Sequence, residues 1–130
     1  MTQKKEPGPR KTTRAEFEAF KKSFLEWQRK LGLLAYSPAF QLKKMDGRFA
    51  EIDVNHMGKI ALVTLNSETD TDNIPFWNPA GSGAHEAFHL LIARISWLGH
   101  YRYTTRDEIN EEDEAIVRRL EHAFEIKVKK

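Results

Sequence analysis

The sequence contains no cysteine, so disulfide bonds and thiolate metal ligands are both excluded. It also lacks a run of about 18 consecutive apolar residues, the length that a membrane-spanning helix requires. Residues 1–11 lack the apolar core of a signal peptide. These absences predict a cytoplasmic protein without a membrane segment, because a chain without disulfide bonds suits a reducing compartment.

The chain also lacks a large excess of charge of either sign. The chain has 21 basic and 19 acidic residues, and its net charge of +2 is too small to indicate nucleic-acid binding over its surface. Basic residues do gather in two tails, 1–12 and 127–130, and these allow at most a weak contact with nucleic acid. Nothing in the composition specifies an oligomeric state.

The size and composition predict one compact domain. A chain of 130 residues, of which 40% are hydrophobic, can bury a single core without cross-links. We place this domain at 13–126, between the C-terminal tail and a disordered N-terminal tail in which Pro7 and Pro9 stand among charges. It should begin with a helix, because Thr13 starts a capping box and aromatic residues follow at helical spacing until Gly32.

Three strands are predicted next, at 40–45, 48–54 and 59–66. A two-residue turn signal at 46–47 joins the first pair, and 55–58 joins the second strand to the third. The expected fold is therefore α+β, with an N-terminal helix, a three-stranded antiparallel meander and two C-terminal helices. Because the third strand is apolar on both faces, it needs cover on both or a partner at its edge.

The segment after these strands carries the motif H-E-x-x-H at His85, Glu86 and His89. Residues four apart share one face of a helix, so both histidines can bind one metal ion while Glu86 projects toward a metal-bound water, as in a zinc peptidase. The stretch 84–98 is mostly apolar, so burying these polar groups is costly unless a cation compensates them. Two core histidines hydrogen-bonded to backbone or carboxylate groups are the alternative interpretation. Ser82 is expected to cap this helix.

A catalytic zinc site needs a third protein ligand. The acidic helix predicted at 110–124 offers Glu112, which lies within about 40° of the centre of the helix's apolar stripe. Asp113, at the other edge of the stripe, and His100, which Gly99 could bring back toward the motif, are alternatives.

The motif, paired with Glu112 on a later helix, resembles the gluzincin metallopeptidases. The nearest resemblance is to the small minigluzincins and the SprT-like metallopeptidases, including those carried by phages, over roughly the last three quarters of the chain. The resemblance implies that zinc is bound by His85, His89 and Glu112, and that Glu86 acts as general base.

Two features depart from the gluzincin pattern. Ile116 stands where an acidic residue often orients a zinc histidine, and the SprT-like branch commonly uses a later histidine as third ligand, for which His100 is available. The related metzincin motif is excluded, because Ile92 and Ile95 occupy its glycine and histidine positions.

The resemblance also implies hydrolysis of a peptide or protein substrate that pairs with an edge strand, here 59–66. The residues between the two C-terminal helices offer four candidate donors to the developing oxyanion, of which Tyr103 is the expected one; the others are His100, Tyr101 and Arg102. His56 and His122 are expected to be surface histidines. Two other functions stay open, a non-catalytic binding or regulatory module and a DNA-associated SprT-like protease anchored by the basic tails.

Overall fold

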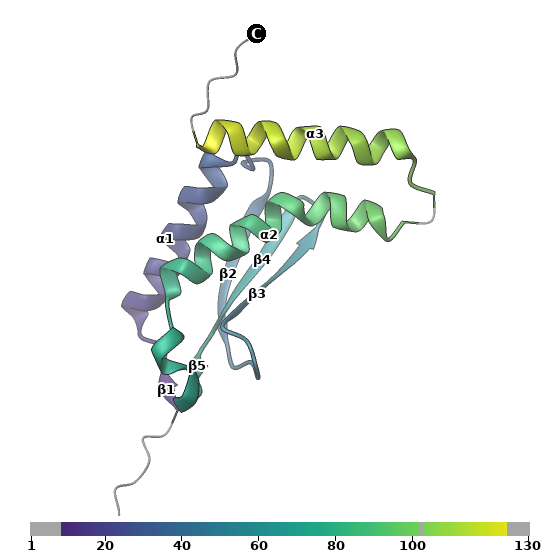
Figure 1. Cartoon of the computed structure of the whole chain (residues 1–130). Coiled ribbons are helices and arrows are strands. Elements are labelled where there is room, and N and C mark those ends of the chain that lie inside the picture. Colours follow the sequence, from purple (N-terminus) through teal and green to yellow (C-terminus); the bar gives the residue numbers. More distant parts are fainter. Residues whose placement is uncertain (1–8, 102, 125–130) are drawn as a thin grey trace, which may run out of the picture.

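The computed structural model describes residues 9–101 and 103–124, and its elements are arranged as in Figure 1. Its helices are α1 (Arg14–Lys30), α2 (Pro79–Gly99) and α3 (Arg106–Ala123), and its larger sheet contains β2 (Ser37–Lys43), β3 (Ala50–Asn55) and β4 (Ile60–Asn66). A smaller sheet pairs β1 (Arg10–Lys11) with β5 (Glu68–Thr69), and the 3-10 helix η1 (Thr71–Phe76) follows. The expected α+β class is confirmed.

Helix α1 begins as the sequence predicts. The Thr13 side chain accepts a hydrogen bond from the Glu16 backbone N–H, and the Glu16 side chain accepts one from the Thr13 N–H. The aromatic stripe then packs inward, with Phe20 and Phe24 fully buried and both rings edge-on to Phe40 of β2. Burial of each phenylalanine stabilises the fold by about 1.5–3 kcal/mol, so this contact fixes α1 on the sheet.

The order of strands in the larger sheet is β2-β4-β3, with β4 antiparallel to β3 and parallel to β2. The predicted antiparallel meander is therefore wrong, as is the hairpin at 46–47, because β2 and β3 do not pair with each other. The turn at 55–58 does join two paired strands. Strand β4 lies at the centre because it is apolar on both faces and gains most from neighbours on both edges, with Val63 and Leu65 fully buried.

The N-terminal tail is ordered at its inner end. Arg10 and Lys11 pair antiparallel with Thr69 and Glu68, which corrects the expectation that disorder extends to residue 12. Arg10 also bonds to the carboxylate of Glu16 at 2.7 Å, so charge complementarity as well as backbone pairing holds this segment. The rest of the predicted basic tails, 1–8 and 127–130, lies outside the described residues.

Helix α2 begins at Pro79, several residues before the H-E-x-x-H motif. Asn78 is its N-cap, accepting a hydrogen bond from the Gly81 N–H, and Pro79 occupies the first turn, so the expected cap at Ser82 is wrong. Helix α1 lies against this first part of α2, where Gly83 is buried and a Cβ built on it would lie 2.4 Å from the Phe20 carbonyl oxygen. Glycine at 83 thus allows the two helices to approach closely.

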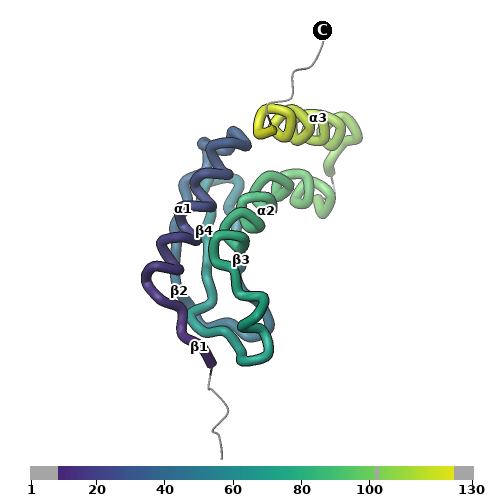
Figure 2. Tube along the Cα trace, turned by 60° about the vertical axis from the view of Figure 1, so that its left-hand side comes forward, coloured from purple at the N-terminus to yellow at the C-terminus, as the bar shows by residue number. Residues whose placement is uncertain are grey.

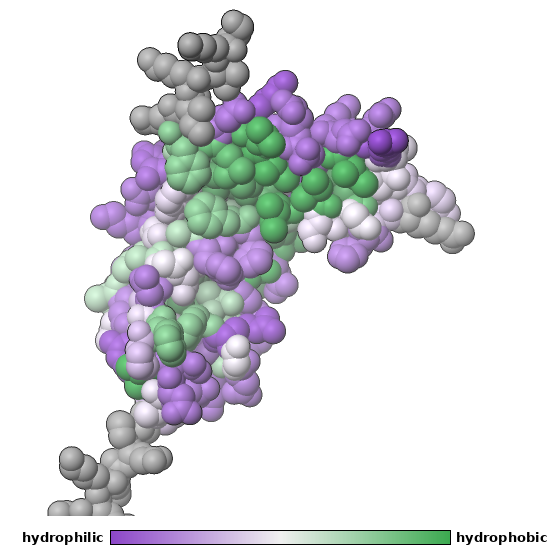
Figure 3. All heavy atoms as spheres, in the orientation of Figure 1, coloured by the Kyte–Doolittle hydropathy of each residue, from purple (hydrophilic) through white to green (hydrophobic). Residues whose placement is uncertain are grey.

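Helix α3 returns along α2 and ends beside α1, as the trace in Figure 2 shows. Its inner side packs Ile116, Leu120 and Ala123 against the core. Apolar side chains remain exposed along the junction of α2 and α3, where Figure 3 shows a continuous hydrophobic area. Exposed apolar residues of these elements include Phe88 of α2, Val117 of α3 and Phe124, which caps the end of α3. Among the described helices, none has the length and apolar character needed to cross a membrane.

Candidate metal centre

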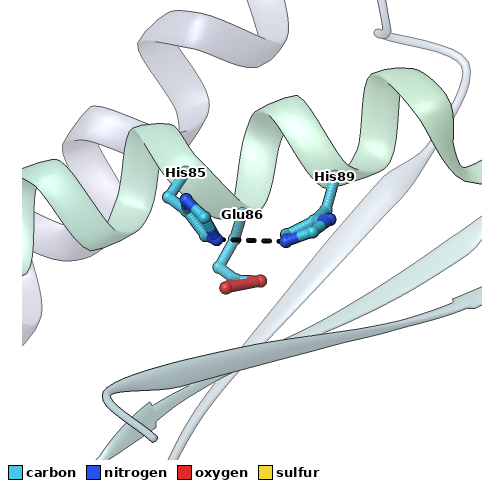
Figure 4. A group of neighbouring side chains, drawn as sticks. All are labelled: His85, Glu86 and His89. Carbon is cyan, nitrogen blue, oxygen red and sulfur yellow. Dashed lines mark hydrogen bonds between the residues drawn. The ribbon is translucent and has the colours of Figure 1, made fainter.

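Helix α2 brings the three motif residues together on one side. His85 and His89 are one helical turn apart, and their Nε2 atoms lie 3.0 Å from each other. Glu86 lies beside them, and one ligand atom from each of the three residues falls within 4.8 Å of the others. Figure 4 shows all three side chains pointing from α2 toward the strands.

The donor set fits a divalent transition metal. Zinc bonds to histidine nitrogen at about 2.0–2.1 Å, so two imidazoles in tetrahedral coordination hold their nitrogens roughly 3.3 Å apart. The observed separation of 3.0 Å is close to that value. Both histidines are exposed at the surface of the groove described below, which leaves room for further ligands. The residues present can therefore hold half of a zinc coordination shell.

Glu86 differs from the histidines in being buried, with 4% of its surface exposed. Burial raises the pKa of its carboxyl group to about 7; the negative charge of Glu51 adds to the rise and the positive charge of Arg48 opposes it. A carboxyl group with a pKa near neutrality can both accept and release a proton at physiological pH, as general acid-base catalysis requires.

The three residues lie in a groove of about 670 Å³ between α2 and β3. Its β3 wall presents Ala50, Ile52 and Val54, with Gly47, Arg48 and Glu51 at one end. Its α2 wall runs from His85 to His100 and includes Ile92, Ala93, Ser96 and Trp97. One face of one helix therefore supplies both the metal-binding groups and half of the lining.

The strand beside this groove is an edge strand. Within the part of the chain that the structure describes, strand β3 pairs with β4 on one side only, so its other edge carries backbone groups that no strand pairs with. The sequence pointed to 59–66 as the edge strand, and this was wrong, because β4 is central. The edge strand beside the groove is instead β3, Ala50–Asn55.

The structure does not bring Glu112 into the group formed by the motif residues. The Glu112 carboxylate instead forms an ion pair with Arg94 at 3.1 Å, and Arg94 lies about 140° around α2 from His89. Asp113 is exposed on α3. His100 lines the same groove, but among the described residues it is not part of the group that His85, Glu86 and His89 form.

Two further predictions concern side chains near the groove. Tyr103 is 77% exposed and is not part of the groove lining. His56 is half-buried, in contrast to the expected surface histidine: its Nδ1 lies 3.2 Å from the Tyr36 hydroxyl and its ring stacks obliquely on Trp97. Burial, followed by the charges of Arg94 and Lys59, lowers the pKa of His56. His122 is exposed, as expected.

Sequence reasoning missed Arg48, Glu51 and Trp97 as groove residues. Arg48 and Glu51 flank the start of β3, and their distance along the chain from the motif gives no sign that β3 will lie beside α2. Trp97 shares a helix with the motif and falls near its face, so helical periodicity could have identified it.

Comparisons with models of protein families, with curated proteins and with solved structures gave no match. A function for this chain therefore has to be inferred from the site.

Proposed function

We propose that this protein is a zinc-dependent peptidase in which Glu86 is the general base. The observation that carries the proposal is the pair of histidine nitrogens 3.0 Å apart beside a buried carboxyl group whose pKa is raised to about 7. A purely structural histidine pair would not need a buried acid next to it, since burying an unpaired carboxyl group costs free energy.

His85 and His89 would hold the zinc ion, which when bound supplies Lewis acidity toward water and toward a peptide carbonyl. Glu86 would accept a proton from the attacking water and deliver it to the leaving amine. The β3 wall of the groove, with Ala50, Ile52 and Val54, would place apolar side chains of the protein beside the substrate.

A peptide is the substrate class that the groove favours. The unpaired edge of β3 can add an extended chain by backbone hydrogen bonds, and the side-chain positions of that chain would then alternate between the groove and solvent. This mode needs no particular side chain, which is consistent with a site built mainly from one helix and one strand. We also propose a cytoplasmic location, because a chain without cysteine needs no oxidising environment.

Glu112 remains our proposed third ligand, and ligation requires it to leave Arg94. That ion pair is partly exposed, with 42% of the Arg94 side chain accessible, so opening it costs little, but α3 would also have to move, because Arg94 lies about 140° around α2 from His89. His100 is the rival ligand; it lines the groove about 16 Å along from His89, so the chain after Gly99 would have to fold back toward the motif.

Zinc stoichiometry tests the proposal directly. We would load tag-free protein with zinc, dialyse it and measure bound metal by elemental mass spectrometry. We expect about one zinc per chain, lost in His89→Ala and Glu112→Gln and retained in His100→Ala. Loss in His100→Ala with retention in Glu112→Gln would transfer the third ligand to His100. A wild-type protein that binds no zinc would overturn the proposal.

A further inference from the structure

We infer that Arg48 binds a carboxylate at one end of the groove, and that the preferred substrate is a peptide with a free C-terminus. The inference rests on the proposed peptidase function and specifies its substrate class. Hydrolysis would then place the hydroxyl of water on the carbonyl carbon and its proton on the departing amine, releasing the C-terminal residue as a free amino acid.

The first support is the direction in which the groove runs. Arg48 and Glu51 line the groove with the motif residues, and Phe49, between them, lies with its ring 5.5 Å from that of Trp77, just before the start of α2. At the other end, His56, just beyond β3, lies with its ring 5.4 Å from that of Trp97, near the end of α2. Strand β3 and helix α2 therefore run in the same direction along the groove, with Arg48 at the end that holds the motif.

The second support is the asymmetry of the groove. Its α2 wall begins at His85, so none of the earlier α2 residues contributes to it. Beyond His89 the wall continues to His100, about 16 Å at the helical rise, which accommodates roughly five extended residues. A peptide antiparallel to β3 would thus have several residues before the scissile bond and its C-terminal end near Arg48.

The third support is the fixed backbone that carries Arg48. Asn66, which is buried, donates through Nδ2 to the Met45 carbonyl at 2.6 Å and to the Arg48 carbonyl at 2.8 Å. Its Oδ1 accepts from the Met45 N–H at 3.1 Å. The segment before β3 is therefore tied to the centre of the sheet, and Arg48 is presented from a defined position.

The side chain of Arg48 has donors to spare. Its Nη1 contacts Oε2 of Glu51 at 3.0 Å in a pair that is 59% exposed on the arginine side. A pair so exposed contributes little, and a guanidinium carries five N–H donors in a planar fork that matches a carboxylate. A second carboxylate can therefore bind alongside Glu51 or displace it. Within the described groove lining, Arg48 is the one side chain of the arginine or lysine type.

The test uses equilibrium binding, so it does not depend on turnover. The probes are three fluorescein-labelled hexapeptides of alternating leucine and alanine: one with a free C-terminal acid, one with a C-terminal amide, and one amide ending in aspartate. Fluorescence anisotropy with the full chain gives each Kd. We expect the free acid to bind at least about tenfold more tightly than the plain amide, as a charge-assisted hydrogen bond allows.

Variants assign the preference to Arg48. Arg48→Gln should abolish the preference for the free acid over the plain amide. Arg48→Lys should retain part of that preference, because lysine keeps the charge without the planar fork. Glu51→Gln should increase it by removing the competing carboxylate. Lys44→Gln, which removes a nearby charge outside the groove lining, should leave it unchanged.

The outcomes separate this inference from the proposed peptidase function. If the amide ending in aspartate bound as tightly as the free acid, and both bound more tightly than the plain amide, the site would recognise any carboxylate, and recognition of a C-terminus would be overturned. Equal binding of all three peptides, or a preference that survives Arg48→Gln, would overturn the role of Arg48 even if the zinc-loaded protein hydrolysed internal bonds. Loss of zinc binding would instead contradict the peptidase proposal, whatever the peptides show.

Discussion

Glu86 is the residue on which catalysis depends in our proposal. Replacing it with glutamine keeps the size of the side chain but removes the base, so we expect peptide hydrolysis by the zinc-loaded protein to fall by about 10²–10⁴-fold while bound zinc stays near its wild-type level. Rate and metal content would be measured on the same sample. Glu111→Gln, an exposed acid on α3, is the matched control and should retain full activity. Unchanged hydrolysis in Glu86→Gln would contradict its role as base.

Glu16 is a residue whose ionisation should make the stability of the fold depend on pH. Burial alone would raise the pKa of its carboxyl group, but hydrogen bonds from Arg10, Thr13 and Trp77 outweigh burial and lower that pKa to about 2. Because the pKa is lower in the folded than in the unfolded state, the ionised form stabilises the fold above about pH 4.5, and this contribution disappears as the pH falls toward 2.

Glu16→Gln should therefore lower the free energy of unfolding at pH 7 by about 1–2 kcal/mol, allowing for solvent screening of the Arg10 partner. The difference from wild type should shrink as the pH falls from 4.5 toward 2, which urea unfolding at several pH values would show. Glu18→Gln removes an exposed acid paired with Lys21 and should change little at any pH. A constant difference between Glu16→Gln and wild type would argue against the lowered pKa.

At the scale of elements, the contact between α1 and α2 is set by Gly83. Alanine normally stabilises a helix by up to about 1 kcal/mol relative to glycine, but here its Cβ would lie 2.4 Å from a backbone oxygen of Phe20. Gly83→Ala should therefore lower the free energy of unfolding by about 1–3 kcal/mol in urea. Gly99→Ala is the matched control on the same helix, because nothing lies within 4 Å of its Cβ position, and it should be neutral or stabilising.

Elements were predictable where their signals are local. The capping box at Thr13 and the spacing of His85 and His89 each depend on residues within one helical turn, so the sequence alone indicates them. The parallel pairing of β2 with β4 depends instead on which strand is stabilised most by neighbours on both edges. Residues close together in the sequence do not indicate this. Arg48 was missed for the same reason, since its role depends on where β3 lies relative to α2.

At the scale of the whole molecule, the position of α3 links the fold to metal binding. Glu112 is held by Arg94 on a side of α2 away from the histidine pair, and the contacts of α3 with the core are confined to one side of that helix. If Glu112 exchanges Arg94 for zinc, α3 has to move as a unit relative to α1, because a single side chain cannot bridge the distance around α2.

Zinc loading should therefore change the separation of α1 and α3. The absence of cysteine allows two spin labels to be attached at cysteines introduced in place of Arg29 and Glu114, both exposed. We expect the distance distribution from pulsed electron paramagnetic resonance to shift by more than about 2 Å on zinc addition, beyond a small helix adjustment. The shift should be absent in Glu112→Gln and should occur at lower zinc concentration in Arg94→Gln, where Glu112 is released in advance. A distribution that zinc leaves unchanged, in a protein shown to bind one zinc, would mean that Glu112 is not the third ligand.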